Sequence, residues 1–205
     1  MPDRIAHWQR IYEQCENDEL SWTEAEPTAS LTLVDEARLP AGAAIIDAGA
    51  GTSKLAAELL RRGYGDVTVV DVSAAALERM KAELGDDASR IAWVEADVRD
   101  RDFGRRFDLW HDRALFHFMV EAVDRDAYIA TLERSLRPGG HLVLATFGPE
   151  GPTECSGLPV RRYDADSLQA TLGADFELVS SRLTEHRTPS GRGQQFLYAH
   201  LRRAA

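Results

Sequence analysis

The stretch Ala44–Gly63, AIIDAGAGTSKLAAELLRRG, has the pattern that decides the fold. The apolar residues that end in Asp47 are typical of a buried strand, and the apolar residues after Lys54 recur with helical spacing. Between them lies a turn of small residues with Gly49 and Gly51, which can adopt backbone conformations closed to other residues. Because the free N–H groups of the following helix face such a turn, we expect a ligand to bind there.

Strand and helix patterns alternate along the rest of the chain. Strands are expected at 44–48, 67–71, 91–95, 107–111, 141–147, 176–185 and 195–201. Helices are expected at 5–16, 54–62, 74–83, 125–136 and 164–172, with short ones at 116–122 and before Ala37, the latter capped by Thr28 or Ser30. The alternation predicts an α/β fold with a doubly wound, seven-stranded, mostly parallel sheet. Since a Pro/Gly turn joins the last two strands, the sheet should end in an antiparallel C-terminal hairpin strand.

Length, charge and cysteine content narrow the class of protein. The 205 residues suit a single domain, 1–205, with a sizeable core. A formal net charge of -10 argues against broad nucleic-acid binding, which depends on clustered Lys and Arg. No apolar run approaches the roughly 18 residues of a membrane helix, and the N-terminus lacks the apolar core of a secretory signal, so we expect a cytoplasmic protein. Cys15 and Cys155 predict neither a disulfide framework nor a metal site. No feature specifies an oligomeric state.

The residues of the turn distinguish between kinds of nucleotide site. A dinucleotide fingerprint, G-x-G-x-x-G, would need a third glycine where the chain has Lys54, and the phosphate-loop pattern G-x-x-x-x-G-K-[ST] does not occur here. The turn is D-x-G-x-G-x-S. It resembles the first motif of class I S-adenosylmethionine-dependent methyltransferases, usually [DE]-x-G-x-G-x-G, with Ser53 in place of the third glycine. An ordinary turn between a strand and a helix would give the same pattern.

Three later segments resemble parts of the same family in the same order. VTVVDVS ends a strand in Asp71, whose carboxylate can accept both hydroxyls of a ribose, a feature shared with dinucleotide enzymes. In WVEADV, Asp97 stands where the family usually has an acid that meets the adenine amino group, and LRPGGHLVLATF resembles its loop and fifth strand. The resemblance implies S-adenosylmethionine as cofactor and S-adenosylhomocysteine as product. The cofactor-binding residues that it implies are Asp47, Gly49, Gly51, Asp71, Val72, Asp97, Val98, His111 and Trp22.

The fourth strand and the residues after it, FDLWHDRALFHF, should carry the chemistry, because in this family they face the methyl group and the acceptor. The catalytic candidates are His111, Asp112 and Arg113. His111 is a general base, a cofactor contact or a structural histidine whose hydrogen bonds are satisfied within the protein. We favour a cofactor contact over a general base, although histidine is suited to proton removal near neutral pH. Arg113 either faces the acceptor or forms a buried ion pair with Asp112. Asp112 or His111 would help to deprotonate an amine acceptor.

Segments outside the core are expected to complete the acceptor site. Residues 1–40 would form an N-terminal helical lid on a Rossmann-like core at 41–205. Trp22 lies in this lid. It either packs over the sulfonium end of the cofactor or over the acceptor, or it anchors the first helix to the sheet. The long loop 148–163 follows a strand at its carboxyl end, where long loops are often functional. Its candidate pocket residues are Cys155, Arg161, Arg162 and Tyr163.

The chain also resembles a bacterial group of predicted small methyltransferases. Its segment DRALF is partly similar to the Asp-Lys-Gly segment of the lysine methyltransferases that act on translation elongation factor and on citrate synthase. The predicted function is methyl transfer to a protein lysine or a small molecule, with a nitrogen acceptor favoured. Two alternatives remain. One is a nicotinamide-dependent oxidoreductase, which Lys54 and the terminal hairpin disfavour, and the other is a silent module that binds the cofactor or a partner.

Overall fold

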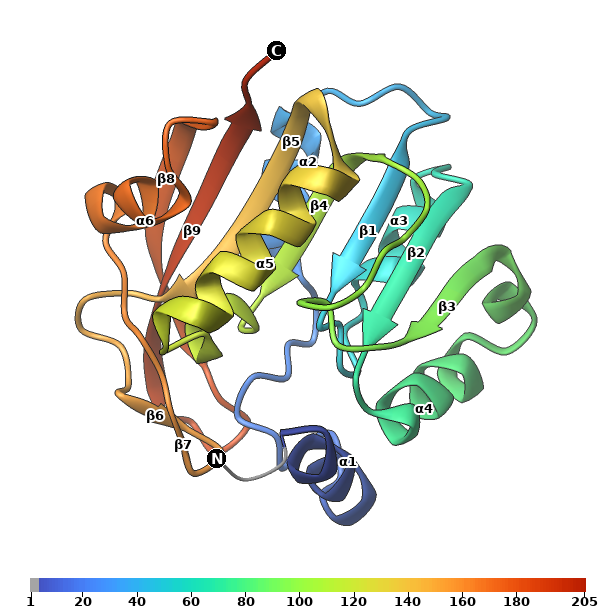
Figure 1. Cartoon of the computed structure of the whole chain (residues 1–205). Coiled ribbons are helices and arrows are strands. Elements are labelled where there is room, and N and C mark those ends of the chain that lie inside the picture. The colour runs from blue at the N-terminus through green and yellow to red at the C-terminus, as the bar shows by residue number, and fades with distance from the viewer. Residues whose placement is uncertain (1–3) are drawn as a thin grey trace.

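The computed structural model describes residues 4–205, and its centre is a seven-stranded sheet (Figure 1). The strand order is β3-β2-β1-β4-β5-β9-β8. The pairs from β3 to β5 are parallel, whereas β9 is antiparallel to both of its neighbours. The strands are β1 Ala44–Ala48, β2 Asp66–Asp71, β3 Ile91–Glu95, β4 Phe107–Arg113, β5 Leu136–Phe147, β8 Phe176–Arg187 and β9 Gly193–Arg203. The predicted sheet with its antiparallel C-terminal strand is confirmed.

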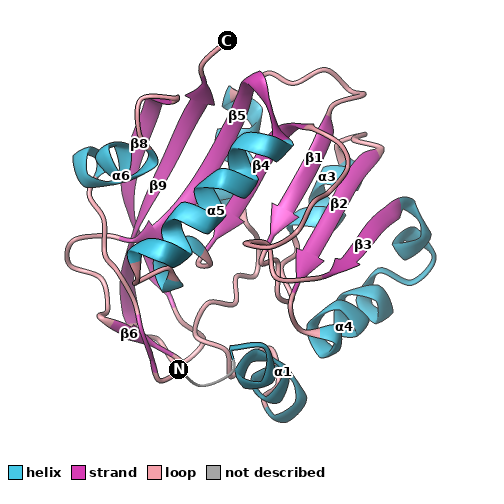
Figure 2. Cartoon of the chain, viewed as in Figure 1, coloured by secondary structure: helices cyan, strands magenta, loops and turns pink. Residues whose placement is uncertain are grey.

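Helices cover both faces of the sheet (Figure 2). A separate hydrophobic core lies between the sheet and the helices on each face. The helices are α1 Arg4–Gln14, α2 Thr28–Glu36, α3 Leu55–Arg61, α4 Ala74–Leu84, α5 Ala122–Ser135 and α6 Ala165–Leu172, with 3-10 helices η1 Gly85–Arg90 and η2 Phe116–Phe118. The first core packs under α2, α3 and α4, and the second under α5 and α6. Because side chains alternate along a strand, Leu109 of β4 lies in the first core and Trp110 in the second.

The strand order reverses between β1 and β4, where open α/β sheets leave a crevice at the carboxyl ends of the strands. Helix α1 lies beyond these strand ends (Figure 1). It is tied to the start of α4, because Gln9 Oε1 accepts hydrogen bonds from Ser73 Oγ at 3.0 Å and Ala75 N at 3.3 Å. Arg79 of α4 also donates to the carbonyl of Cys15 at 2.7 Å. These contacts hold α1 across the crevice.

The ends of several elements differ from those predicted. β5 begins at Leu136 instead of residue 141, because Leu136 already pairs with Phe107. The segment 138–140 is therefore an irregularity inside the strand, not a turn before it. β4 continues past residue 111 to Arg113, which pairs with Ala145. Sheet pairing thus extends both strands beyond the residues whose sequence alone is typical of a strand.

The predicted cap of the short N-terminal helix is wrong. Pro27 occupies the N-cap position of α2, and no side chain caps that end. Ser30 instead directs its hydroxyl at a buried ring nitrogen of His111. The predicted helix at 116–122 is reduced to η2, and the long loop after β5 contains a two-stranded hairpin, β6 (Glu154–Cys155) and β7 (Leu158–Pro159). Within residues 4–205, no helix has the length and apolar character needed to span a bilayer.

Candidate active site

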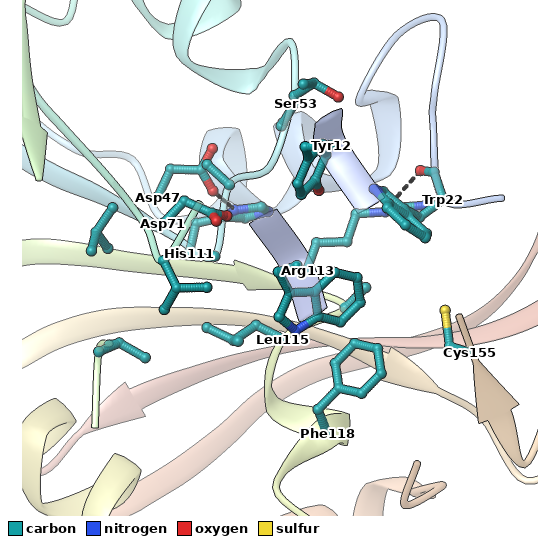
Figure 3. A pocket seen from close by; sticks show the side chains of 18 of the residues that line it. Tyr12, Trp22, Asp47, Ser53, Asp71, His111, Arg113, Leu115, Phe118 and Cys155 are labelled. Carbon is teal, nitrogen blue, oxygen red and sulfur yellow. Dashed lines mark hydrogen bonds and ion pairs between the residues drawn. The ribbon is translucent and has the colours of Figure 1, made fainter. Parts of the chain in front are cut away.

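A pocket opens at the carboxyl ends of β1, β2 and β4, beneath α1 (Figure 3). Its walls come from α1 and the segment that follows it, the turn after β1, the residues after β2 and β3, and the β4–η2 junction. The predicted residues that line it are Trp22, Asp47, Gly49, Asp71, Val72, Asp97, Val98, His111, Arg113 and Cys155. Of the predicted cofactor-binding residues, Gly51 is the one that lies behind the lining. The sheet topology therefore brings together residues that are far apart in the sequence.

The glycine turn after β1 has the backbone that its sequence predicts. Gly49 and Gly51 have φ values of 64° and 56°, in the left-handed region that favours glycine. A Cβ atom on Gly51 would lie 2.1 Å from Tyr12 Oη, and one on Gly49 would lie 2.7 Å from the Leu115 side chain. The glycines thus make room for side chains that pack over the turn. Ser53 does not have a positive φ, so the third position of the motif accepts a side chain without backbone strain.

Asp71, at the end of β2, holds the glycine turn in place. Its carboxylate accepts hydrogen bonds from Gly51 N at 2.8 Å and from Ser73 N at 2.9 Å. Burial raises the pKa of Asp71 to about 6, although these two hydrogen bonds act in the opposite direction. The carboxylate therefore changes its charge within the near-neutral pH range.

Asp47, His111 and Ser30 form a buried chain of hydrogen bonds under the pocket. Asp47 and His111 are direct partners on neighbouring parallel strands, and His111 Nδ1 lies 2.7 Å from Asp47 Oδ1. The other ring nitrogen, Nε2, lies 2.8 Å from Ser30 Oγ. Both nitrogens of His111 are therefore occupied within the protein. Asp47 Oδ2 is buried and has no hydrogen-bond partner in the described part of the chain, which leaves one carboxylate oxygen for a ligand.

Asp112 lies on the opposite face of β4 from His111 and Arg113, because successive side chains of a strand point to opposite faces. Its carboxylate accepts hydrogen bonds from Tyr128 Oη at 2.6 Å and from Leu115 N at 3.1 Å. Burial raises the pKa of Asp112 to about 6, against the effect of these hydrogen bonds. Asp112 does not line the pocket, so the catalytic role predicted for it is withdrawn.

Arg113 ends β4 on the pocket side of the sheet (Figure 3). Its Nε donates to Tyr198 Oη at 2.8 Å and lies 3.1 Å from Glu24 Oε2. Its Nη1 donates to the carbonyl of Trp22 at 2.8 Å, and the guanidinium carbon lies 4.7 Å from the centre of the Phe196 ring. The buried ion pair that the sequence left open thus exists, but its partner is a glutamate from the N-terminal segment and not the neighbouring aspartate.

The pocket has two chemically different sides (Figure 3). We call Asp47, Asp71 and their glycine turn the acidic side. The aromatic side consists of Trp8 from α1, Trp22 and Phe118. The ring centre of Trp8 lies 5.8 Å from that of Trp22 and 5.0 Å from that of Phe118, both edge to face. Polar groups thus face a ligand at one end of the pocket and aromatic surfaces at the other.

Comparison with known proteins shows which domain part of the chain resembles. Residues 45–140 match the methyltransferase domain family. Over 111 residues the chain is 37% identical to the ubiquinone/menaquinone biosynthesis C-methyltransferase UbiE of Paracoccus denitrificans, an alignment that covers 52% of this chain and 43% of that protein. Residues 45–140 thus match a methyltransferase domain, and the chain resembles the class I S-adenosylmethionine-dependent methyltransferases. It spans about half the length of the curated relatives that it matches.

Solved structures of other proteins share the fold of this chain. The 1,6-didemethyltoxoflavin-N1-methyltransferase of Burkholderia thailandensis, solved with 1,6-didemethyltoxoflavin and S-adenosylhomocysteine bound, has a TM-score of 0.77 and 24% identity. The alignment covers 98% of this chain and 88% of that one. A structure that concerns the conversion of a disulfide bond into a thioacetal group during echinomycin biosynthesis has a TM-score of 0.79 and 22% identity, with 98% of this chain and 92% of that chain covered. At these identities the likeness extends to the fold.

The acidic side of the pocket fits the polar groups of S-adenosylmethionine. The unpartnered Asp47 Oδ2 can accept a hydrogen bond from an amino group. Asp71 presents a second carboxylate to hydroxyl groups, and Val72 and Val98 supply apolar lining beside it. Asp97 also lines the pocket, but both of its oxygens already accept hydrogen bonds from Arg99 Nε, at 3.0 and 3.1 Å. Burial raises the pKa of Asp97, yet the hydrogen bonds from Arg99 lower it overall.

Sequence patterns missed several residues of the site. They gave no sign of the Ser30 hydroxyl under His111, because the two residues meet only through the packing of α2 on the sheet. Some lining residues were expected only as parts of a segment, without a role of their own: Arg4, Trp8 and Tyr12 in the N-terminal region, and Leu115 and Phe118 after the fourth strand. Met119 also lines the pocket and lies outside the segments that were expected to hold the acceptor. Apolar periodicity in the first helix placed Trp8 and Tyr12 on one face, and this was a usable but unspecific signal.

The loop after β5 contributes one predicted residue to the pocket. Cys155 lines it, is a free thiol, and has its pKa raised by burial. Tyr163 is instead buried in the second core, where its ring stacks on Phe116 at 5.6 Å. Arg161 lies over the Tyr163 ring, and Arg162 donates to a loop carbonyl at 3.2 Å. The chain direction after β7 turns these three side chains away from the pocket.

Proposed function

We propose that this protein transfers the methyl group of S-adenosylmethionine to a nitrogen atom of a small, flat molecule. The observation that carries this proposal is a single pocket with an acidic side suited to the cofactor and an aromatic side suited to a ring. Helix α1 lies across the opening and is tied to α4. This closure supports a small acceptor over a lysine on a folded protein, which would need an open channel. Nitrogen is supported by the N1-methyltransferase among the structures of like fold.

Each cofactor contact follows from a group that the pocket offers. Asp71 would accept the two ribose hydroxyls, and Asp47 Oδ2 would accept the methionyl amino group. Val72 and Val98 would pack against the adenine ring, with Asp97 at its amino edge. In this scheme His111 is a positioning residue, because it fixes the Asp47 carboxylate through Nδ1.

S-adenosylmethionine, when bound, supplies a methyl group on a sulfonium that is already activated. The chain's own task is to hold the acceptor nitrogen in line, about 3 Å from that methyl, and to exclude water. Trp8, Trp22 and Phe118 perform the exclusion. The ring nitrogens of His111 are both engaged, so His111 does not take a proton from the acceptor. An amine acceptor would therefore enter with its lone pair free.

The N-terminal region of this chain would act as the lid. Within residues 1–40, the described helix α1 and the Trp22 segment supply the aromatic side, while α2 supplies the Ser30 hydroxyl under His111. Acceptor entry would then require α1 to separate from α4.

The test is a methyl-transfer assay with S-adenosylmethionine labelled in the methyl group. The acceptors are a panel of aromatic amines, matched phenols and lysine peptides. Label in an aromatic amine, with an equal amount of S-adenosylhomocysteine formed, is the expected result. Label in lysine peptides alone would overturn the small-molecule assignment. Tight S-adenosylhomocysteine binding with no transfer to any acceptor would support a silent binding module.

A further inference from the structure

Arg113 carries a buried nitrogen that the protein itself does not use. The Arg113 side chain is 10% exposed, and its Nη2 has no hydrogen-bond partner within residues 4–205. A buried charged donor without a partner is costly, so native proteins normally satisfy it. Since Arg113 lines the pocket, a ligand there can supply the missing oxygen.

The rest of the guanidinium is fixed by four contacts. Arg113 Nε donates to Tyr198 Oη and forms an ion pair with Glu24 Oε2, and Nη1 donates to the Trp22 carbonyl. The ring of Phe196 lies 4.7 Å from the guanidinium carbon and sets its plane. Because these contacts are made in advance, little conformational freedom is lost when Nη2 binds an oxygen.

The position of Arg113 favours the acceptor over the cofactor. Its contacts, Trp22 and Glu24, belong to the segment after α1, and Trp22 is part of the aromatic side. Figure 3 shows Arg113 extending toward Trp22, while Asp47 and Asp71 lie on the other side of the pocket. A ring that packs against Trp22 would bring its substituents close to this guanidinium.

We propose that Arg113 Nη2 binds a carboxylate or carbonyl oxygen on the acceptor, and that this contact selects flat acceptors with such an oxygen next to the methylated nitrogen. This inference rests on the proposed function and names the substrate class for it. Arg113 is then a specificity-determining residue, and Tyr198 and Glu24 position it.

The experiment uses the full-length protein saturated with S-adenosylhomocysteine and titrated with three probes by calorimetry. Anthranilate has a ring amine beside a carboxylate, anthranilamide has a carbonyl in that place, and aniline has neither. We expect anthranilate and anthranilamide to bind at least about tenfold more tightly than aniline. The ratio between the affinities of anthranilate and anthranilamide tells whether the negative charge or the hydrogen bond contributes more to binding.

Two substitutions of Arg113 remove Nη2 in different ways. Arg113→Lys keeps the positive charge and Arg113→Met removes it, and in both the preference over aniline should fall below about twofold. Arg187→Met is the matched control, because Arg187 is 74% exposed and does not line the pocket, and it should keep the wild-type preference. If Arg113 had only a structural role, its substitution would weaken the binding of all three probes equally and leave the preference over aniline unchanged. That result would overturn the proposal.

A separate measurement distinguishes this proposal from the cofactor assignment. The affinities of S-adenosylhomocysteine and methylthioadenosine, which lacks the amino-acid part, are determined first for each variant. If wild-type protein binds neither compound, the proposed function itself fails. If Arg113→Lys weakens S-adenosylhomocysteine more than tenfold and spares methylthioadenosine, Nη2 binds the cofactor carboxylate and the acceptor proposal is overturned.

Discussion

The acidic and aromatic sides of the pocket are built in different ways. The acidic side is made at strand ends, where a hydrogen bond from Gly51 N to Asp71 links two neighbouring parallel strands. The aromatic side is made by rings from α1, the segment after it and η2, which meet only in the folded chain. Backbone geometry therefore fixes the acidic side, whereas side-chain packing fixes the aromatic side. Substitutions should therefore affect the two sides in separable ways.

The largest effect is expected at Asp71. Asp71→Ala removes the carboxylate that we propose accepts two hydrogen bonds from a ribose, and it frees Gly51 N from its partner. The dissociation constant for S-adenosylhomocysteine, measured by calorimetry, should rise at least about 100-fold. Glu95 is the matched control, since it pairs with Asp71 in register but is exposed. Glu95→Ala should bind normally, and an equal loss in both variants would contradict the assignment.

The contact between the acidic side and α1 can be broken at Gly51. Gly51→Ala places a Cβ atom 2.1 Å from Tyr12 Oη in a backbone with positive φ. The free energy of unfolding, from urea denaturation, should fall by about 2–4 kcal/mol. Adding Tyr12→Phe should restore part of it, because the nearest ring atom is then at 3.1 Å. Gly85→Ala, which also has a positive φ of 57° but open space around it, should cost less, because no side chain lies in the way. If Tyr12→Phe gives no rescue, α1 does not rest on the turn.

The acidic side should respond to pH through Asp71. Burial raises its pKa to about 6, so the charged form, which we propose accepts the ribose hydroxyls, is lost as the pH falls through 6. Since only this form binds well, the dissociation constant for S-adenosylhomocysteine should rise about tenfold between pH 7 and pH 5. Asp71→Asn should remove this dependence. A wild-type affinity that stays constant over this range would show that the charge of Asp71 is not used.

The smallest effect is expected on the face of β4 away from the pocket. Tyr128→Phe removes the hydroxyl that donates to Asp112 and accepts from Trp110. The free energy of unfolding should fall by about 1–2 kcal/mol, while the S-adenosylhomocysteine dissociation constant stays within twofold. A weakened affinity with unchanged stability would return Asp112 to the active site.

The same contrast explains what could be predicted from the sequence. Asp47, Gly49 and Asp71 belong to local strand–turn patterns, so their spacing predicted the acidic side. His111 and Arg113 were correctly expected at the pocket, but Asp112 between them was not separated from them. If β4 had been expected to continue past residue 111, the alternation of side chains along a strand would have placed Asp112 on the face opposite to His111 and Arg113.

The aromatic side could not be derived in this way. Trp8 and Phe118 are far apart in the sequence, and nothing local to either residue indicates that their rings meet. The same holds for the hydrogen bond between Ser30 and His111, which depends on how α2 packs. The predicted roles of Trp22 and Cys155 remain predictions, although both residues line the pocket.

The central claim is that this pocket binds S-adenosylmethionine and not a dinucleotide. The most direct test is a calorimetric titration of the wild-type protein with S-adenosylhomocysteine and, separately, with NADH. We expect one site per chain with a dissociation constant near micromolar for S-adenosylhomocysteine, and no measurable heat with NADH. Preference for NADH, or no binding of S-adenosylhomocysteine, would contradict it.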